Sequence, residues 1–479
     1  MSVVALLVLA GATSTTTTAA PDRFAIVVGY NQADRAELDD LRFADDDAAR
    51  FFELVSLGAA RAHLLTVFDP PSQALYPRLV SIARAPTRAE LSRTLRSVAD
   101  AVTAARDAGR RSEVHFFYAG HGDVDDGVGY VNLVDGRWTR DDLERELLTQ
   151  IEADLKHVVI DACKSYFMVS GRGPGGERTT TPSAYAGPKP RPGVGLVLST
   201  SNDAESHEFA ALSAGIFSHE VRSALLGAAD IDGDRAVDYF ELGAFVSAAN
   251  EGVAIARYRP NVFIRPPEGL QDAPLLKVPD TPRLALDAPV AGRVRITDPR
   301  GLRHVDLHKA RGRVLRIGLL EPGTYEVELD DVRFEVPAAT GEVELSALPA
   351  QPKREGTRGL AHEAFEQLFT TPFSPDVVRG FRLGREVETL TALSSPPEDP
   401  ARRRWGAGLA IGGGAGLAIG AVLMAVAADR RASAGDAQLD QVQRRQRIDE
   451  ADAWTVGAGS AAGLGLAAAV TGAVLLLTE

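Results

Sequence analysis

Short apolar runs alternate with longer segments of mixed polarity over the first half of the chain. The segments between the runs look like helices, and Thr87-Arg-Ala-Glu90 has the spacing of a full capping box at a helix start. Alternating strands and helices from about residue 22 to residue 266 predict an α/β domain of three layers with a mainly parallel sheet. Five runs are almost purely apolar, which is typical of strands covered on both faces: Phe24–Gly29, His63–Phe68, Val114–Tyr118, His157–Ile160 and Val194–Leu198.

The pattern changes after residue 270, so we place the end of the first domain there, with its start at residue 21. Residues 275–350 hold short β-prone runs separated by Pro-Gly and Asp-Asp turns, which predicts a small antiparallel β-sandwich. Because no catalytic set of side chains groups within it, we expect a structural or binding accessory. Residues 351–404 are charged, contain proline and are interpreted as a connector.

Two segments near the C-terminus, Trp405–Ala428 and Ala453–Thr478, are uncharged, apolar and long enough to cross a bilayer. They predict two transmembrane helices within residues 405–478, joined by a short polar loop. Five arginines in the loop at 429–452, against three at 402–404, place the loop in the cytoplasm and the N-terminal part outside.

The N-terminus agrees with this orientation. Residues 3–12 are apolar and are followed by the small residues Ala19 and Ala20, which predicts a signal peptide over residues 1–20. The alternatives are a mis-chosen start codon and a buried first strand. Only 6 of the 52 basic residues are Lys, which together with abundant Ala and Gly suggests a GC-rich bacterial genome. We therefore expect a protein of the bacterial inner membrane whose large N-terminal part faces the periplasm.

Composition excludes some functions. The net charge is −13, and a nucleic-acid partner would require a basic surface. The chain has one cysteine, Cys163, so it cannot form an internal disulfide or a thiolate zinc site.

That cysteine and one histidine follow two of the predicted strands. The strand Val114–Tyr118 runs into Ala119-Gly120-His121-Gly122, and the strand His157–Ile160 runs into Asp161-Ala162-Cys163. Ligands of open parallel sheets bind beyond the carboxyl ends of the strands. If the two strands are neighbours, the imidazole and the thiol share one crevice, where the histidine can take the proton of the nucleophile.

The pair Tyr118-Ala-Gly-His121-Gly and Ile160-Asp-Ala-Cys163 resembles the paired signature of the caspase-like cysteine peptidases, the clan of caspases, metacaspases and paracaspases. Three other stretches fit the resemblance, which covers about residues 22–266: Phe24-Ala-Ile-Val-Val-Gly29, Leu41-Arg-Phe-Ala-Asp-Asp-Asp47-Ala48 and Gly215-Ile-Phe-Ser-His219-Glu220. The resemblance does not reach the predicted sandwich or the membrane segments.

The resemblance implies roles for individual residues. Cys163 would be the nucleophile, His121 the general acid and base, and Gly122 would offer its N–H group to the oxyanion beside the amide of Cys163. Asp161 stands where caspases, which cut after Asp, carry Gln; a carboxylate there favours Arg or Lys at P1. Asp47 aligns with a second pocket acid of metacaspases, and the alternative is that it caps a helix.

The chain departs from the family after the cysteine. Metacaspases usually continue Cys-His-Ser-Gly after the Asp, whereas this chain has Lys164-Ser-Tyr-Phe167. The Gly-, Pro- and Thr-rich stretch Ser170–Pro192 follows and could be an activation loop, a substrate loop or a plain linker. An inactive binding or scaffold protein therefore remains the alternative to a membrane-anchored endopeptidase that acts on protein or peptide substrates.

A separate acidic segment has the spacing of a calcium-binding loop of twelve residues. Arg235 stands at position 6, where Gly normally makes the sharp turn. The chemistry itself requires no cofactor, and the alternative is a loop held without metal by turns of its Asp side chains. The predicted ligands, at positions 1, 3, 5, 7, 9 and 12, are Asp230, Asp232, Asp234, the carbonyl of Ala236, Asp238 and Glu241.

Overall fold

The computed structural model describes residues 20–35, 38–169, 191–199, 208–209, 212–253, 259–260, 262–338, 341–352, 367–383 and 428. The chain divides into two compact units, Met1–Glu386 and Val387–Glu479, and every described residue except Ala428 belongs to the first. Within the described ranges no helix is both long and apolar enough to cross a bilayer. Apart from Ala20 and Ala428, the predicted signal peptide and both predicted membrane helices lie outside these ranges.

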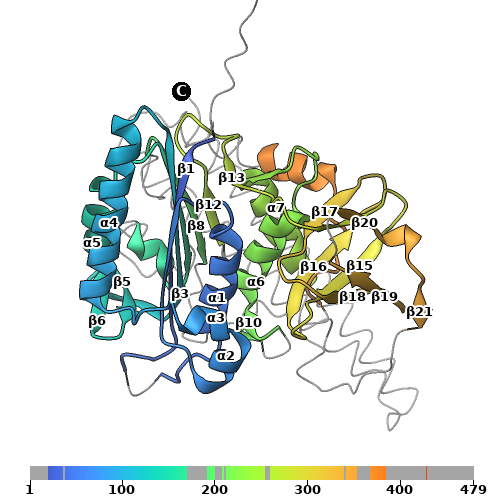
Figure 1. The fold of residues 1–479 in the computed structure, drawn as a ribbon, viewed down its shortest axis with the longest axis horizontal. Helices are drawn as coiled ribbons and strands as arrows, with labels where there is room; N and C mark the ends of the chain where they lie inside the picture. The colour runs from blue at the N-terminus through green and yellow to red at the C-terminus, as the bar shows by residue number, and fades with distance from the viewer. Residues whose placement is uncertain are drawn as a thin grey trace, which may run out of the picture. The chain divides into compact units, whose positions relative to one another are not determined.

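A six-stranded sheet forms the centre of the first unit, with the strand order β12-β8-β7-β3-β1-β2 (Figure 1). Five of its strands are parallel, and β12 pairs antiparallel at one edge. The predicted α/β domain with a mainly parallel sheet is thereby confirmed. The strands are β1 (Asp22–Tyr30), β2 (Arg61–Thr66), β3 (Ser112–Gly120), β7 (Leu155–Asp161), β8 (Val194–Ser199) and β12 (Val262–Arg265).

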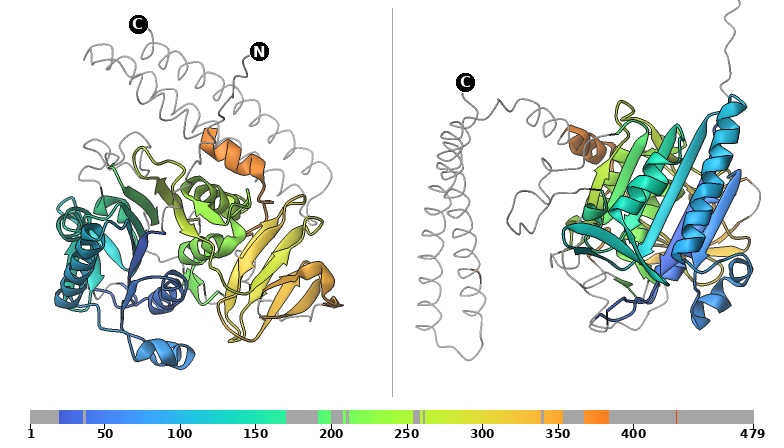
Figure 2. Two further views of the ribbon diagram at one scale, coloured as in Figure 1. Left: turned by 45° about the horizontal axis from the view of Figure 1, so that its top comes forward. Right: turned by 90° about the vertical axis from the view of Figure 1, so that its left-hand side faces the viewer.

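Helices cover both faces of this sheet, as Figures 1 and 2 show. Alternate residues of β1 divide between two cores: Ile26 packs with α4 on one face, and Val27 packs with α1 on the other. On the first face lie α4 (Arg88–Asp107), α5 (Arg140–Asp142) and η1 (Leu143–Thr149). On the second lie α1 (Ala44–Val55), α6 (Ile216–Ser223), η4 (Ala224–Ala228) and α7 (Tyr239–Glu251), and the short α2 (Pro70–Leu75) and α3 (Pro77–Val80) follow β2.

The predicted capping box at the start of α4 forms only in half. The Thr87 side chain accepts the N–H of Glu90, but the N–H of Thr87 donates to the carbonyl of Ala85. The Glu90 side chain instead forms ion pairs with Arg84 and Arg93. Two nearby guanidinium groups thus compete successfully with the backbone for this carboxylate.

Small sheets complete the α/β part. A three-stranded antiparallel sheet follows β3 directly and carries the segment after His121. Its strands are β4 (Gly122–Asp125), β5 (Val128–Leu133) and β6 (Gly136–Thr139). Two antiparallel pairs join β9 (Glu208–Phe209) to β10 (Ala214–Gly215), and β11 (Ala236–Asp238) to β13 (Pro274–Lys277). A short 3-10 helix, η2 (Ser165–Met168), follows the cysteine.

Residues 283–352 form two further sheets, with the strand orders β17-β14-β20 and β16-β15-β18-β19-β21. The expectation of purely antiparallel strands is wrong for one pair, since β14 and β20 run parallel. The reason is that the chain crosses from β19 in the larger sheet to β20 in the smaller one. The elements are β14 (Arg283–Leu286), β15 (Gly292–Thr297), β16 (Arg303–Lys309), β17 (Leu315–Gly318), β18 (Thr324–Leu329), β19 (Val332–Pro337), β20 (Glu342–Glu344), η6 (Leu345–Ala347) and β21 (Gln351–Pro352).

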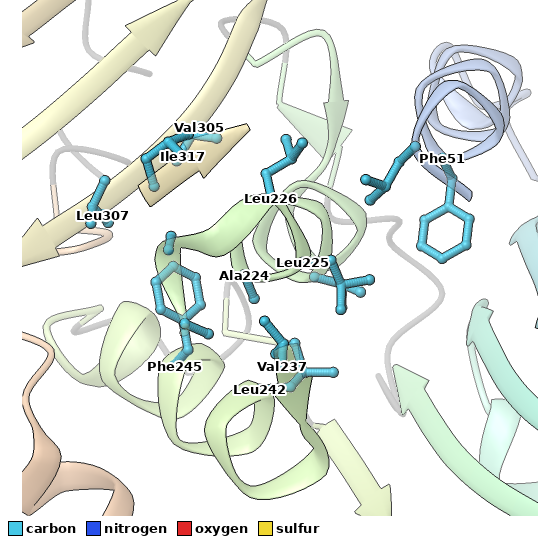
Figure 3. Packing of buried hydrophobic residues seen from close by; sticks show 14 of the residues in the cluster. Phe51, Ala224, Leu225, Leu226, Val237, Leu242, Phe245, Val305, Leu307 and Ile317 are labelled. Carbon is cyan, nitrogen blue, oxygen red and sulfur yellow. The ribbon is translucent and has the colours of Figure 1, made fainter. Parts of the chain in front are cut away.

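The two-sheet region shares its hydrophobic core with the α/β part. Leu226 of η4 and Phe245 of α7 lie beside Val305 and Ile317 of the sheets, and all four are buried (Figure 3). At Gly227, φ is +112° and a Cβ atom would collide with the carbonyl of Arg316. Only glycine permits this approach of η4 to β17.

A buried hydrogen bond between a histidine and a carboxylate crosses the same boundary. Asp306 Oδ2 on β16 lies 2.8 Å from Nε2 of His219 on α6, and Arg303 lies 3.5 Å from the other carboxylate oxygen. Burial alone would raise the pKa of Asp306, but Arg303 and His219 hold it at about 2. The carboxylate is therefore charged and Arg303 supplies the counter-charge, whereas burial lowers the pKa of His219 to about 4, so that ring is a neutral hydrogen-bond donor.

Asp306→Ala is expected to lower the free energy of unfolding by about 3 kcal/mol, because it leaves the buried His219 ring without its acceptor and Arg303 without its counter-charge. Urea unfolding of the full chain measures this loss. The control is Asp376→Ala, since the Asp376–Arg379 pair is exposed and such pairs contribute little. Equal midpoints for Asp306→Ala and the wild type would show that the buried pair does not stabilise the fold.

Candidate active site

A narrow cavity of about 40 Å³ opens at the carboxyl ends of the central strands. It brings together four residues that the sequence nominated from separate segments, namely Asp47, His121, Asp161 and Cys163. The remaining lining residues are Leu41, Ala44, Ala119, Gly120, Ala162, Ser199, Glu208, Gly215, Ile216, Phe217 and Pro260.

The backbone of His121 is fixed where β3 ends. Gly120 has a φ of +155°, and a Cβ atom there would lie 2.5 Å from the hydroxyl of Tyr118. That hydroxyl lies 3.0 Å from the carbonyl oxygen of His121 and 2.8 Å from that of Asn132. The N–H of Asn132 also donates to the His121 carbonyl. The turn that carries the imidazole is therefore held on two sides.

The environment of the His121 ring favours its neutral form. Burial lowers the pKa of His121, while a hydrogen bond to the backbone carbonyl of Asp39 opposes that shift. Nε2 is buried and has no hydrogen-bond partner among the described residues. A neutral imidazole oriented by a carbonyl can accept a proton from a thiol at neutral pH.

Cys163 lies on the turn after β7 and is partly exposed. The turn is closed by Ser165, whose hydroxyl donates to the carbonyl of Ser199 on the next strand. Gly122 packs against this turn, because a Cβ atom on it would lie 2.9 Å from the carbonyl oxygen of Cys163. A glycine at that position lets the histidine and cysteine segments approach closely.

Two carboxylates flank Gly215, those of the buried Asp47 and the half-buried Asp161. The N–H of Gly215 donates to Asp47 Oδ2 at 2.8 Å, and the hydroxyl of Ser218 donates to Asp161 Oδ2 at 2.6 Å. Burial and the nearby Asp161 raise the pKa of Asp47 well above its usual value. Asp47 is not a helix cap, since Phe43 occupies that position of α1.

Glu208 is a third acid in the cavity that the sequence did not nominate. Its carboxylate accepts the N–H groups of Arg42 and Phe43 at the start of α1. Burial raises its pKa, and Asp161 adds to that effect. Nothing in the sequence separates it from the neighbouring acids Asp203 and Glu205, because the contact of Glu208 with the cavity depends on the tertiary fold.

Lys164, which replaces the usual family residue after the cysteine, joins the two candidate catalytic segments. It has a φ of +53°, and its Nζ lies 2.5 Å from Oδ1 of Asp123, two residues after His121. Arg35 forms an ion pair with the same carboxylate. Burial would raise the pKa of Asp123, but the hydrogen bond from Lys164 and the nearby Arg35 keep it low.

We expect Lys164→Ala to lower kcat for peptide cleavage roughly 10-fold, because small errors in the position of reacting groups are costly. KM should change little, since Lys164 does not line the cavity. Lys164→Arg keeps the ion pair and should retain most of kcat. Steady-state kinetics with one peptide checks both, and a wild-type kcat for Lys164→Ala would show that the link does not position the cysteine.

The predicted calcium loop lies away from this cavity. Three of its six predicted ligands lie close together. Carboxylate oxygens of Asp230, Asp232 and Asp234 lie within 4.8 Å of one another. Arg235 takes the left-handed conformation, with a φ of +68°, that Gly would normally supply at position 6. The Glu241 carboxylate accepts the N–H groups of Ile231 and Asp238.

Burial and the Asp238 and Asp232 carboxylates raise the pKa of Glu241 to about 8. Asp238 caps α7 and pairs with Arg382, so it and Glu241 have protein partners that a cation would have to displace.

Comparison with known proteins agrees with this architecture. Residues 22–254 match the family model Peptidase_C14, described as Caspase domain. The chain therefore contains a caspase-like α/β domain, and proteins of that family are cysteine hydrolases. No curated protein matches the chain.

Two solved structures are similar to part of the chain. A crystal structure of protein GSU0716 from Geobacter sulfurreducens is 17% identical, covers 54% of this chain and 100% of its own, and has a TM-score of 0.33. A structure of pro-sf-caspase-1 is 16% identical, covers 51% of this chain and 87% of its own, and has a TM-score of 0.30.

Proposed function

We propose that the chain is a cysteine endopeptidase that cleaves peptide bonds after Arg or Lys. The observation that carries the proposal is the convergence of a thiol, an imidazole and three carboxylates on one cavity. The thiol and imidazole supply the reaction, and the carboxylates supply the preference for a cationic side chain.

In the proposed reaction His121 takes the proton of Cys163, and the sulfur attacks the carbonyl carbon of the scissile bond. The N–H groups of Gly122 and Cys163 donate to the oxyanion. The tetrahedral intermediate then collapses, and His121 gives its proton to the leaving amine. Water deprotonated by His121 hydrolyses the thioester, which restores the thiol and releases the new carboxylate.

The three acids explain the choice of substrate. A guanidinium or ammonium group entering the cavity would compensate Asp47, Asp161 and Glu208, which otherwise repel one another. An Asp side chain would add a further negative charge to the same space. The expected ratio of rates for Arg over Asp at P1 is therefore large.

The test uses the purified full chain in detergent and fluorogenic peptides that differ only at P1, with Arg, Lys, Gln or Asp. We expect turnover of the Arg and Lys peptides and labelling of Cys163 by a thiol-reactive peptidyl probe. No turnover and no labelling would reject the peptidase and leave an inactive caspase-like binding protein.

We also propose that residues 405–478 anchor the protein in the bacterial inner membrane, with the caspase-like domain in the periplasm. Two uncharged segments of spanning length support this proposal, as does the arginine distribution around them. External protease added to spheroplasts should digest the N-terminal part. Protection of that part in intact spheroplasts, but not after lysis, would reject the orientation.

Calcium binding at Asp230–Glu241 is a further proposal, supported by the spacing of the acids and the grouping of the first three. We expect the melting temperature of the full chain to rise with CaCl₂ relative to chelator, because a ligand of the native state stabilises it. The rise should disappear in Asp232→Asn and persist in the control Asp376→Asn. Equal melting temperatures of the wild type in calcium and chelator would reject the site.

A further inference from the structure

Three titratable side chains meet at the end of the sheet opposite the candidate active site. Glu113 and His115 lie near the start of β3 and, being two residues apart, point to the same face. His157, near the start of β7, is the cross-strand neighbour of His115. The two imidazole rings stack with their centroids 4.6 Å apart and their planes inclined by 24°.

The arrangement has the composition of a metal site. One ligand atom from each of the three residues lies within 4.8 Å of the other two. Two imidazoles and one carboxylate are a known ligand set for Zn²⁺, with a water molecule as the fourth ligand. Two nitrogens on one tetrahedral Zn²⁺ are about 3.4 Å apart, so binding would bring the ligand atoms closer together and turn the stacked rings until their lone pairs meet at the ion.

Unpartnered nitrogen atoms are the second and independent observation. His115 is 4% exposed and His157 is 1% exposed, yet Nε2 of each has no hydrogen-bond partner within the part of the chain that the structure describes. Buried polar atoms in folded proteins are normally satisfied, so two such atoms on adjacent rings call for an occupant.

The other nitrogen of His157 has a partner that suits a ligand. His157 Nδ1 shares a hydrogen bond of 2.7 Å with the hydroxyl of Tyr239, the first residue of α7. Gly195 on β8 makes room for that ring, because a Cβ atom there would overlap the hydroxyl. Hydrogen bonds of this kind fix the orientation of metal-binding histidines.

The surrounding charges are mixed. Burial lowers the pKa of both imidazoles, which leaves them neutral and able to donate a lone pair. Burial raises the pKa of Glu113, while Arg23 and Lys277 oppose that shift. A bound cation would compete with these two basic groups for the carboxylate, so we expect reversible binding that salt and pH modulate.

We propose that Glu113, His115 and His157 bind one divalent transition-metal ion, with Zn²⁺ the best match to the ligand set. Such an ion would join β3 to β7, the strands whose far ends lead to His121 and Cys163. The site is distinct from the acidic loop at Asp230–Glu241 and from the candidate active site, and it does not depend on peptidase activity.

The experiment uses the full chain carrying Cys163→Ala, which removes the thiol of the candidate active site, a strong ligand for Zn²⁺. Zn²⁺ alone is titrated by calorimetry, and Co²⁺ absorption reports a tetrahedral site with nitrogen and oxygen ligands. We expect one equivalent of metal, a melting temperature that rises with Zn²⁺ concentration, and affinity at least 10-fold weaker in Glu113→Gln and in His115→Leu.

Two controls separate this site from other metal-binding groups. His115→Leu replaces an unpartnered buried ring with an apolar side chain, so its melting temperature without metal should match the parent. Asp232→Asn combined with Asp234→Asn should leave Zn²⁺ binding intact. Affinity unchanged in Glu113→Gln and His115→Leu, affinity lost in the acidic-loop variant instead, or no binding by the folded parent would each overturn the proposal.

Discussion

Cys163→Ala is expected to lower kcat for cleavage of an Arg peptide by roughly 10⁴-fold or more, since the nucleophile has no substitute. The chain contains no other cysteine. His121→Ala should cause a loss of similar size, and the double variant should be no slower than either single variant, because the two groups act as a unit.

Stopped and continuous assays with the same fluorogenic peptide measure these losses, and the melting temperature shows that each variant is folded. His308→Ala is the matched control, since its ring lies on β16 and bonds to the carbonyl of Thr370, outside the cavity. Residual cleavage by a folded Cys163→Ala protein at a tenth of the wild-type rate would exclude thiol catalysis.

Asp161→Asn is expected to lower kcat/KM for Arg and Lys peptides by roughly 10²-fold, equivalent to about 3 kcal/mol, as the loss of one partner of a buried charge pair does. The substitution is nearly isosteric, and the amide oxygen can still accept the hydroxyl of Ser218. For a Gln peptide the change should be small, so the ratio of the two kcat/KM values reports specificity rather than folding.

The other pocket acids should give graded effects. Glu208→Gln should cost less than Asp161→Asn, because the Glu208 carboxylate is shared with two backbone N–H groups of α1. Asp47→Asn should also lower the ratio of kcat/KM for the Arg peptide to kcat/KM for the Gln peptide. An unchanged Arg-to-Gln ratio in all three variants would reject the proposal that these carboxylates read the P1 side chain.

The sequence predicted five of the six strands of the central sheet because they are short, nearly pure apolar runs. The pattern did not predict the antiparallel edge strand β12, and it left open whether Val114–Tyr118 and His157–Ile160 are neighbours, which the pairing of β3 with β7 answers. The sequence did not predict the structure at Thr87 correctly. The full capping box required Glu90 to accept the N–H of Thr87, but Glu90 pairs with two arginines instead. The sequence also missed the parallel pairing of β14 with β20, since the chain enters β20 from the other sheet and the direction of that crossing depends on long-range packing.

Some residues of the candidate site could likewise be predicted from the sequence, and others could not. His121 and Cys163 could be nominated because each directly follows a recognisable strand and is flanked by distinctive residues. Glu208, the carbonyl of Asp39 and the Lys164–Asp123 pair could not, because each contact joins segments far apart in the chain that no local pattern brings together. Those contributions depend on tertiary structure alone.

The helix α6 has a consequence for how this protein can be dissected. Its N-terminal end supports the pocket, since Gly215 and Ser218 bind the carboxylates of Asp47 and Asp161. The residue after Ser218, His219, forms a hydrogen bond with Asp306 of the two-sheet region. A fragment ending near residue 270 would uncover the apolar side of η4 and α7 and remove the support of α6. The caspase-like domain and the two sheets after it should therefore be cloned, expressed and crystallised as one unit.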